Sequence, residues 1–188
     1  MIQQNFLLWY YLSMINIVLY RPEKPSNVGN IMRTVSATDS YLIIIGPLSF
    51  EFNDKSLKRA GMDYLENLNY KYYESLELFL KEYDENKIYY VTRYSKNIYS
   101  NFNYSDLLED ITFMFGREST GIPHELLKKH LNHTIRIPMV ANARSLNLSN
   151  TVALVLYEAL RQRNFFNLAT REEIKGEDFL ITEDIKND

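Results

Sequence analysis

Five short runs of apolar residues recur along the chain, separated by longer stretches in which polar and apolar residues mix. The runs are nearly continuous instead of alternating, which is typical of strands that are buried on both faces. We expect each run to form a strand inside a sheet. The runs cover residues 16–20, 41–46, 87–92, 111–116 and 134–139.

The stretches between these runs carry apolar residues at helical spacing. In the last stretch, Val152, Val155 and Ala159 fall on a single helical face. Strands that alternate with helices indicate an α/β domain with a mostly parallel sheet and helices on both faces. The predicted helices cover residues 27–38, 54–65, 74–85, 123–131 and 150–163.

The two ends of the chain differ from this central pattern. Residues 1–13 hold no charged side chain and lack the basic region of a signal peptide. The apolar run over residues 1–20 is interrupted by Ser13 and Asn16, so it is too short and too polar for a membrane span. From residue 164 onward, charge rises and periodicity fades. We therefore expect an extension (1–13), one domain (14–163) and a helical or disordered acidic tail (164–188).

The composition of the chain limits which kinds of functional site it can contain. A chain of 188 residues with a net charge of −3 suits one domain, and a nucleic-acid site on it must be a local patch. Cysteine is absent, which excludes disulfides and a thiol nucleophile and agrees with a cytoplasmic location. His124, His130 and His133 match no metal-binding motif, so no metal site is predicted.

Polar residues follow the first predicted strand, and ligands of parallel sheets bind beyond the carboxyl ends of strands. Pro22 and Pro25 should hold this segment extended, and Ser26 or Asn27 can cap the next helix. Arg33 lies one turn inside that helix, where it could reach an anion at the helix N-terminus. A capped helix with a surface arginine explains the same residues.

Two further polar segments follow the fourth and fifth strands. In the first, Gly116, Gly121 and Pro123 shape a turn around Glu118, which an ordinary loop with a solvated glutamate also explains. The second, RSLNLSN at 144–150, joins two apolar elements. Its small polar residues can satisfy the backbone of a buried connection or face a ligand. Both interpretations stay open.

Together the three segments resemble the motifs of the SPOUT superfamily of RNA methyltransferases, in its SpoU branch. The matches are N-x-G-N-I-x-R-T at 27–34, F-G-x-E-x-x-G-I-P at 115–123 and I-P-M-x5-S-L-N-L-S-N at 137–150. The resemblance runs over residues 14–162. Within the branch the chain is most similar to the small wobble-ribose methyltransferases of tRNA, on the basis of M-I-N-I-V-L-Y-R-P-E at 14–23 and K-R-A-G-M-D-Y at 58–64.

The resemblance implies a deep trefoil knot in the C-terminal half and a bound S-adenosyl-L-methionine as methyl donor. Residues at the family's adenosine site correspond to Val91, Gly116, Ile137 and Ser145. Residues 93–110 are longer and more polar than the family pattern, which affects the placement of Val91.

The implied catalytic residues are Arg33, Asn30 and Asn147. A free arginine is a poor base because its pKa exceeds about 12, so we expect Arg33 to bind the adjoining phosphate and stabilise developing charge. Asn30 and Asn147 would orient Arg33 and the nucleotide, and Glu118 would brace its loop. Candidate phosphate contacts are Lys55, Lys58, Arg59, Lys128, Lys129 and Arg144.

The implied reaction is 2′-O-methylation of ribose 34, on cytidine or uridine, in the tRNA anticodon stem-loop. The resemblance further implies a homodimer that pairs through helix 150–163 and the motif-one helix. Helix 150–163 is apolar over more than one face, which a larger monomer core would equally explain. Two alternatives are a 2′-O-methyltransferase for another tRNA or rRNA site and a non-catalytic SPOUT-fold RNA-binding subunit.

Overall fold

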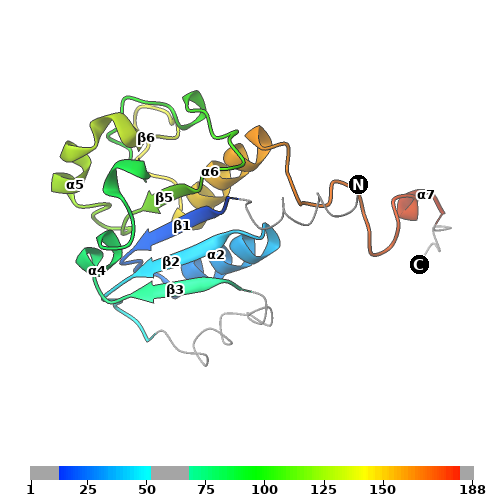
Figure 1. Cartoon of the computed structure of the whole chain (residues 1–188), viewed down its shortest axis with the longest axis horizontal. Coiled ribbons are helices and arrows are strands. Elements are labelled where there is room, and N and C mark those ends of the chain that lie inside the picture. Colours follow the sequence, from blue (N-terminus) through cyan, green and yellow to red (C-terminus); the bar gives the residue numbers. More distant parts are fainter. Residues whose placement is uncertain (1–12, 52–67, 183–188) are drawn as a thin grey trace.

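A single parallel sheet organises the residues that the computed structural model describes, 13–51 and 68–182 (Figure 1). Its six strands lie in the order β3–β2–β1–β5–β4–β6, and every neighbouring pair is parallel. The strands are β1 (Ile15–Tyr20), β2 (Tyr41–Ile45), β3 (Tyr70–Tyr73), β4 (Ile88–Val91), β5 (Ile111–Phe115) and β6 (Thr134–Ile135).

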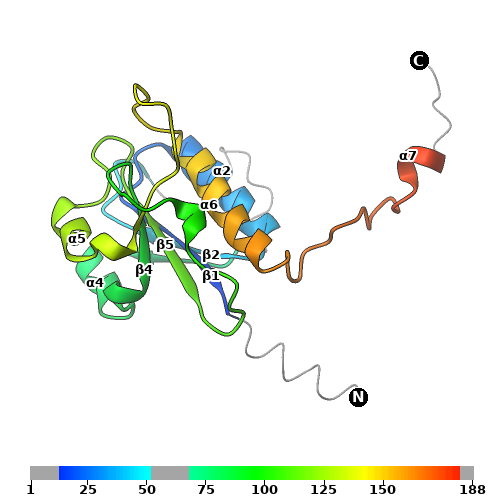
Figure 2. The same ribbon diagram turned by 90° about the horizontal axis from the view of Figure 1, so that it is seen from above.

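Helices cover both faces of this sheet (Figure 2). Helices α2 and α6 lie side by side on one face, and α4 and α5 pack on the other. The helices are α2 (Pro25–Ala37), α4 (Leu76–Leu80), α5 (His124–Lys129), α6 (Leu148–Gln162) and α7 (Phe179–Thr182), with 3₁₀ turns η2 (Glu85–Lys87), η3 (Tyr99–Asn101) and η4 (Leu131–His133).

Burial on both faces explains the continuous apolar runs. In β1, Ile17 and Leu19 pack toward α2 and α6, whereas Val18 packs toward α4 and α5. A polar pair also lies in this interior, because the Asn16 amide donates to the Thr112 hydroxyl of β5 at 3.2 Å. The predicted α/β class with a parallel sheet is confirmed.

The first four predicted strands are confirmed, but the fifth is much shorter than expected. β6 ends at Ile135, and Arg136 adds only an isolated bridge to Ile98. Pro138 has no N–H to donate and therefore cannot continue a ladder. The pattern also missed β3, an edge strand whose residues 70–72 are exposed and so form no apolar run.

Helix boundaries correct two further expectations. Pro25 is the first residue of α2 and does not extend the preceding segment, because its fixed φ suits a first helical turn. Ser26 and Asn27 consequently lie inside the helix, and the N-cap residue Lys24 makes no side-chain cap bond. The helix expected at 74–85 divides into α4, capped by Ser75, and η2. The helix expected at 54–65 lies outside the described residues.

The topology places a crevice at the centre of the sheet. β1 and β5 are neighbours, but the chain leaves β1 toward β2 on one side and leaves β5 toward β6 on the other. Such a reversal of strand order opens a ligand-binding crevice at the carboxyl ends of the strands. The trefoil knot concerns how the chain threads through itself, and it stays a prediction.

Beyond α6, Phe165 and Leu168 still pack against the core, and the chain then leads away from the sheet to α7 (Figures 1 and 2). Buried Arg163 fastens this end of α6 by donating to the carbonyls of Ser13, Tyr104 and Glu109. Ser13, the last residue of the predicted extension, thus contacts the domain. The division into extension, domain and tail stays a prediction. Among the described residues no helix is long and apolar enough to cross a membrane.

Candidate active site

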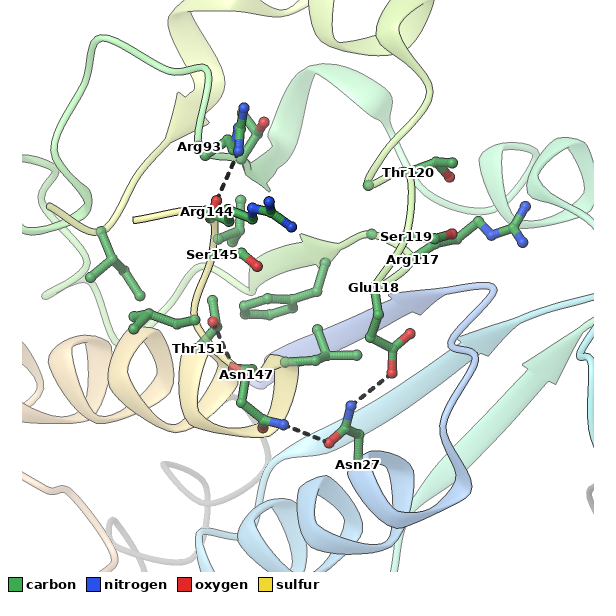
Figure 3. Close-up of a pocket in the computed structure, with 18 of the residues that line it drawn as sticks. Asn27, Arg93, Arg117, Glu118, Ser119, Thr120, Arg144, Ser145, Asn147 and Thr151 are labelled. Atoms are coloured by element: carbon green, nitrogen blue, oxygen red, sulfur yellow. Dashed lines mark hydrogen bonds between the residues drawn. The ribbon is translucent and has the colours of Figure 1, made fainter. Parts of the chain in front are cut away.

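A cleft of about 750 Å³ lies at this crevice and is lined by the segments that follow β1, β4, β5 and β6 and by the first turn of α6 (Figure 3). This volume is in the range of small-molecule sites. The lining includes all four predicted cofactor contacts, Val91, Gly116, Ile137 and Ser145, and also Asn147. Asn30 and Arg33 are exposed on α2 and are not part of the lining.

A tight turn forms one wall of the cleft and requires glycine at Gly116. A Cβ added there would lie 2.2 Å from the carbonyl carbon of Gly121. The turn closes through two backbone hydrogen bonds between Arg117 and Gly121, at 3.2 and 2.9 Å, and Gly121 has a φ of +74°. Any side chain at Gly116 must therefore push this wall apart.

A chain of side-chain hydrogen bonds joins the three motifs (Figure 3). The buried Asn27 amide of α2 donates to Glu118 Oε1 at 2.7 Å. The Asn147 amide, at the start of α6, donates to Asn27 Oδ1 at 3.0 Å. Residues far apart in sequence thus fix the relative positions of α2, α6 and the turn after β5.

Asn147 also caps α6. Its Oδ1 accepts from the backbone N–H groups of Ser149 and Asn150, at 2.9 and 3.4 Å. The side chains of Arg144 and Ser145 line the cleft. The capping interpretation of the RSLNLSN segment is confirmed by Asn147, and the interpretation that its neighbours face a ligand stays a prediction.

Two glutamates brace the loops after β1 and β5 reciprocally. Glu118, after β5, accepts from the backbone N–H groups of Glu23 and Lys24, at 2.8 and 3.3 Å. Glu23, after β1, accepts from the Ser119 N–H and hydroxyl, both at 2.8 Å, and from Arg117 at 2.6 Å. The prediction that Glu118 braces its loop is confirmed, and a merely solvated glutamate is excluded.

The hydrogen bonds to Glu23 should make the stability of the folded protein depend on pH in the acid range. The hydrogen bond from the Ser119 hydroxyl, supported by Arg117, lowers the pKa of Glu23 from its ordinary value of 4.5. A carboxylate whose pKa is lowered in the folded state stabilises that state above the unfolded-state pKa. The stabilisation is lost as the pH falls through the folded-state pKa.

We expect Glu23→Gln to lower the free energy of unfolding by about 1 kcal/mol at pH 7, because the half-buried pair is partly screened by solvent. The difference from the parent protein should shrink below pH 4.5 and vanish once Glu23 is protonated. Urea unfolding measured at several pH values checks this. A difference that stayed constant down to pH 2 would contradict the assignment, and Glu177→Gln in the tail serves as the control.

Replacing Asn147 with alanine should cost about 2 kcal/mol of stability. The change removes a helix N-cap, typically worth about 1 kcal/mol, and leaves the side-chain oxygen of Asn27, Oδ1, without its donor. Asn142→Ala, an exposed asparagine of the same loop, should change stability by less than about 0.5 kcal/mol. Equal melting temperatures for the two variants would show that the chain of hydrogen bonds contributes little.

Two side chains of the site, those of Asn27 and Glu23, were not predicted as site residues from the sequence. The sequence assigned Asn27 no role beyond helix capping and a motif match, and it assigned Glu23 no role. Of the predicted phosphate contacts, Arg144 lines the cleft, Lys128 and Lys129 lie in the last turn of α5, and the others lie outside the described residues.

Charge in the cleft wall is mostly positive. The carboxylate in the lining is Glu118, and the cations are Lys24, Arg93, Arg117 and Arg144. Arg117 is paired with Glu23 at 2.6 Å, so the positive charge of the wall that is not paired in this way comes from Lys24, Arg93 and Arg144 and is partly balanced by Glu118.

Each of the three histidine rings packs against a tyrosine ring. His130 stacks on Tyr90, His133 stacks on Tyr89, and His124 meets Tyr94 edge to face. Among the described residues, no group of three or more potential ligands is placed to hold a metal ion.

The chain belongs to the SpoU methylase family, because residues 14–157 match the model of the SpoU rRNA Methylase family. It is 51% identical over 150 residues to the "Putative tRNA (cytidine(34)-2′-O)-methyltransferase" of Listeria monocytogenes, covering 80% of this chain and 89% of that protein.

Solved structures agree with this assignment. One of these structures, described in work on the 2′-OH methylation of C/U34 on tRNA, superimposes with a TM-score of 0.73 at 33% identity. The match covers 81% of this chain and 97% of that chain. The SpoU methyltransferase AviRb of Streptomyces viridochromogenes, in complex with AdoMet, superimposes with a TM-score of 0.67 at 25% identity, covering 81% and 59%.

Proposed function

We propose that this chain is an S-adenosyl-L-methionine-dependent 2′-O-methyltransferase acting on ribose 34, the wobble position, of tRNA. The observation that carries the proposal is the cleft in which the Glu118–Asn27–Asn147 hydrogen bonds unite all three motifs. The relatives named for cytidine 34 of tRNA support this position, and they align over most of their own length.

The cleft suits the methyl donor chemically. Val91, Phe115 and Ile137 give it apolar walls that can hold an adenine ring, and Ser145 and Asn147 add polar groups for a ribose. The donor supplies a methyl group on a positively charged sulfonium, which is already activated for transfer. The residues of this chain therefore have to position the ribose and help its hydroxyl lose a proton.

Arg33 is the proposed group that binds the phosphate beside the acceptor ribose and stabilises the charge that develops. It is exposed on the outer face of α2 and lies outside its own cleft lining. We therefore propose that Arg33 of one protomer serves the cleft of its partner in a homodimer. Asn30, exposed on the same helix, would orient Arg33.

The surface of α6 supports this pairing, although not through the residues expected. Val152, Val155, Leu156, Ala159 and Leu160 all pack into the core of their own chain. The surplus apolar surface is instead Leu154, 44% exposed, and Tyr157, 48% exposed, which are neighbours on one helical face. Because α2 and α6 lie side by side, one partner could cover this surface and the outer face of α2 together.

The rRNA alternative follows from the description of the family, and the test must separate the two substrates. Purified protein should methylate an anticodon stem-loop with C34 or U34, and mass spectrometry should place the methyl group on ribose 34. A variant stem-loop with a 2′-deoxyribose at position 34 is the control and should stay unmodified. Methylation of ribosomal RNA alone would favour the alternative, and no methylation of any RNA would favour a binding subunit.

Saturating S-adenosyl-L-methionine should raise the melting temperature of the protein. At about a hundred times its dissociation constant, a ligand that binds only the folded state adds roughly 2.7 kcal/mol. The shift should persist in EDTA. Differential scanning fluorimetry checks both points, and a shift that EDTA abolished would contradict the metal-free site.

A further inference from the structure

The cleft rim carries an exposed tyrosine for which the family motifs give no role. Tyr94 lies in the segment after β4 and lines the cleft. Its side chain is 63% exposed, more than any other aromatic residue among the exposed hydrophobics of the described chain. Single exposed apolar residues are common, so exposure alone assigns no role.

The ring of Tyr94 is nevertheless held in place. The Arg93 guanidinium lies over the ring, 5.0 Å from its centroid, and His124 meets the ring in an edge-to-face contact at 5.5 Å. The Arg93 guanidinium is itself fixed, because it donates to the Arg144 carbonyl at 2.9 Å (Figure 3).

The backbone that carries Tyr94 is also fixed. The Tyr94 N–H donates to the Thr92 hydroxyl at 3.3 Å. The next residue, buried Ser95, donates through its hydroxyl to the Thr134 carbonyl of β6 at 2.8 Å. The tyrosine is thus an exposed aromatic ring on an anchored turn.

Its position suits a nucleobase. Arg93 and Arg144 lie together on one side of the cleft, opposite the Glu118–Asn27–Asn147 hydrogen bonds (Figure 3). Proteins that bind single-stranded nucleic acid combine cations that follow the backbone with aromatic rings on which bases stack. Tyr94, with Arg93 over its ring and Arg144 in the same cleft lining, reproduces this combination at the rim.

We propose that Tyr94, backed by Arg93, is the platform on which an unpaired base next to the acceptor nucleotide stacks. The inference rests on the proposed function, since it needs a single-stranded RNA loop as substrate. Aromatic stacking tolerates every base, so Tyr94 would position the loop without selecting its sequence.

The test compares three substitutions in the full-length protein with an anticodon stem-loop as substrate. Tyr94→Leu keeps an apolar side chain but removes the ring, so the KM for RNA should rise about tenfold while kcat stays within about twofold. Tyr94→Phe keeps the ring and should restore KM. Phe166→Leu removes another exposed aromatic residue beyond the far end of α6 and is the matched control.

A direct readout uses 2-aminopurine in place of each base that flanks position 34. Parent protein and Tyr94→Phe should quench its fluorescence, whereas Tyr94→Leu should not. An unchanged KM and unchanged quenching in Tyr94→Leu would overturn the platform. So would a loss of S-adenosyl-L-methionine affinity with normal RNA affinity, which would assign the ring to the cofactor. If parent protein methylates no stem-loop, the proposed function fails first, and the two failures are thereby distinguished.

Discussion

Replacing Arg33 with alanine should lower the methylation rate of tRNA by about 10²- to 10³-fold, the usual loss when a group that stabilises developing charge is removed. The affinity for S-adenosyl-L-methionine should stay nearly the same, because Arg33 is proposed to contact the phosphate beside the acceptor ribose and is not one of the predicted adenosine contacts. Arg33→Lys should also fail, since a point charge cannot replace a planar guanidinium that binds phosphate with two donors.

Single-turnover methylation and calorimetric titration of the methyl donor measure the two effects separately. Arg171→Ala is the matched control, because Arg171 is an exposed arginine whose partner, Glu177, also lies in the tail. Methylation by Arg33→Ala at a near-parental rate would remove Arg33 from the mechanism. A loss of donor affinity equal to the loss of rate would place Arg33 in the cofactor site instead.

Mixing two inactive variants should restore about a quarter of the parental activity if the active site is shared between protomers. One variant is Arg33→Ala. The other is Gly116→Trp, whose side chain cannot fit where even a Cβ would lie 2.2 Å from Gly121. In a mixed dimer, one site combines the intact cleft of the first variant with Arg33 of the second.

Gly116→Ala provides a smaller change at the same position, in case the tryptophan variant does not fold. Two copies of the Arg33→Ala variant, mixed and assayed in the same way, are the control and should stay inactive. Stable dimers without complementation would contradict a shared site. A fully active protein that sediments as a monomer at micromolar concentration would contradict the dimer itself.

Periodicity predicted the buried parts of this fold because burial on both faces leaves a continuous apolar run, as in β1, β2 and β5. It missed β3, whose exposed residues are held by strand pairing with β2 that no local pattern records. The start of α2 was misplaced because Pro25 suits either an extended segment or a first helical turn.

The candidate site, too, could be predicted from the sequence only in part. Gly116 could be predicted from its place directly after a strand, and Asn147 was expected in the site only because of the family resemblance. The partners of Asn27 could not be predicted, because they lie 91 and 120 residues away in the sequence. An asparagine can cap a helix or join separate segments by hydrogen bonds, and only the folded structure shows which of these it does.

The reciprocal glutamates have a consequence for chimaeric enzymes. Each of the two loops supplies a carboxylate that accepts from donors on the other loop. Glu118 accepts from the backbone N–H groups of Glu23 and Lys24. Glu23 accepts from Ser119 and Arg117. A graft of residues 21–27 from a relative without a carboxylate at position 23 would leave Arg117 and Ser119 without their acceptor. The two loops are therefore one module, and residues 116–121 have to be exchanged together with 21–27 whenever substrate specificity is transplanted.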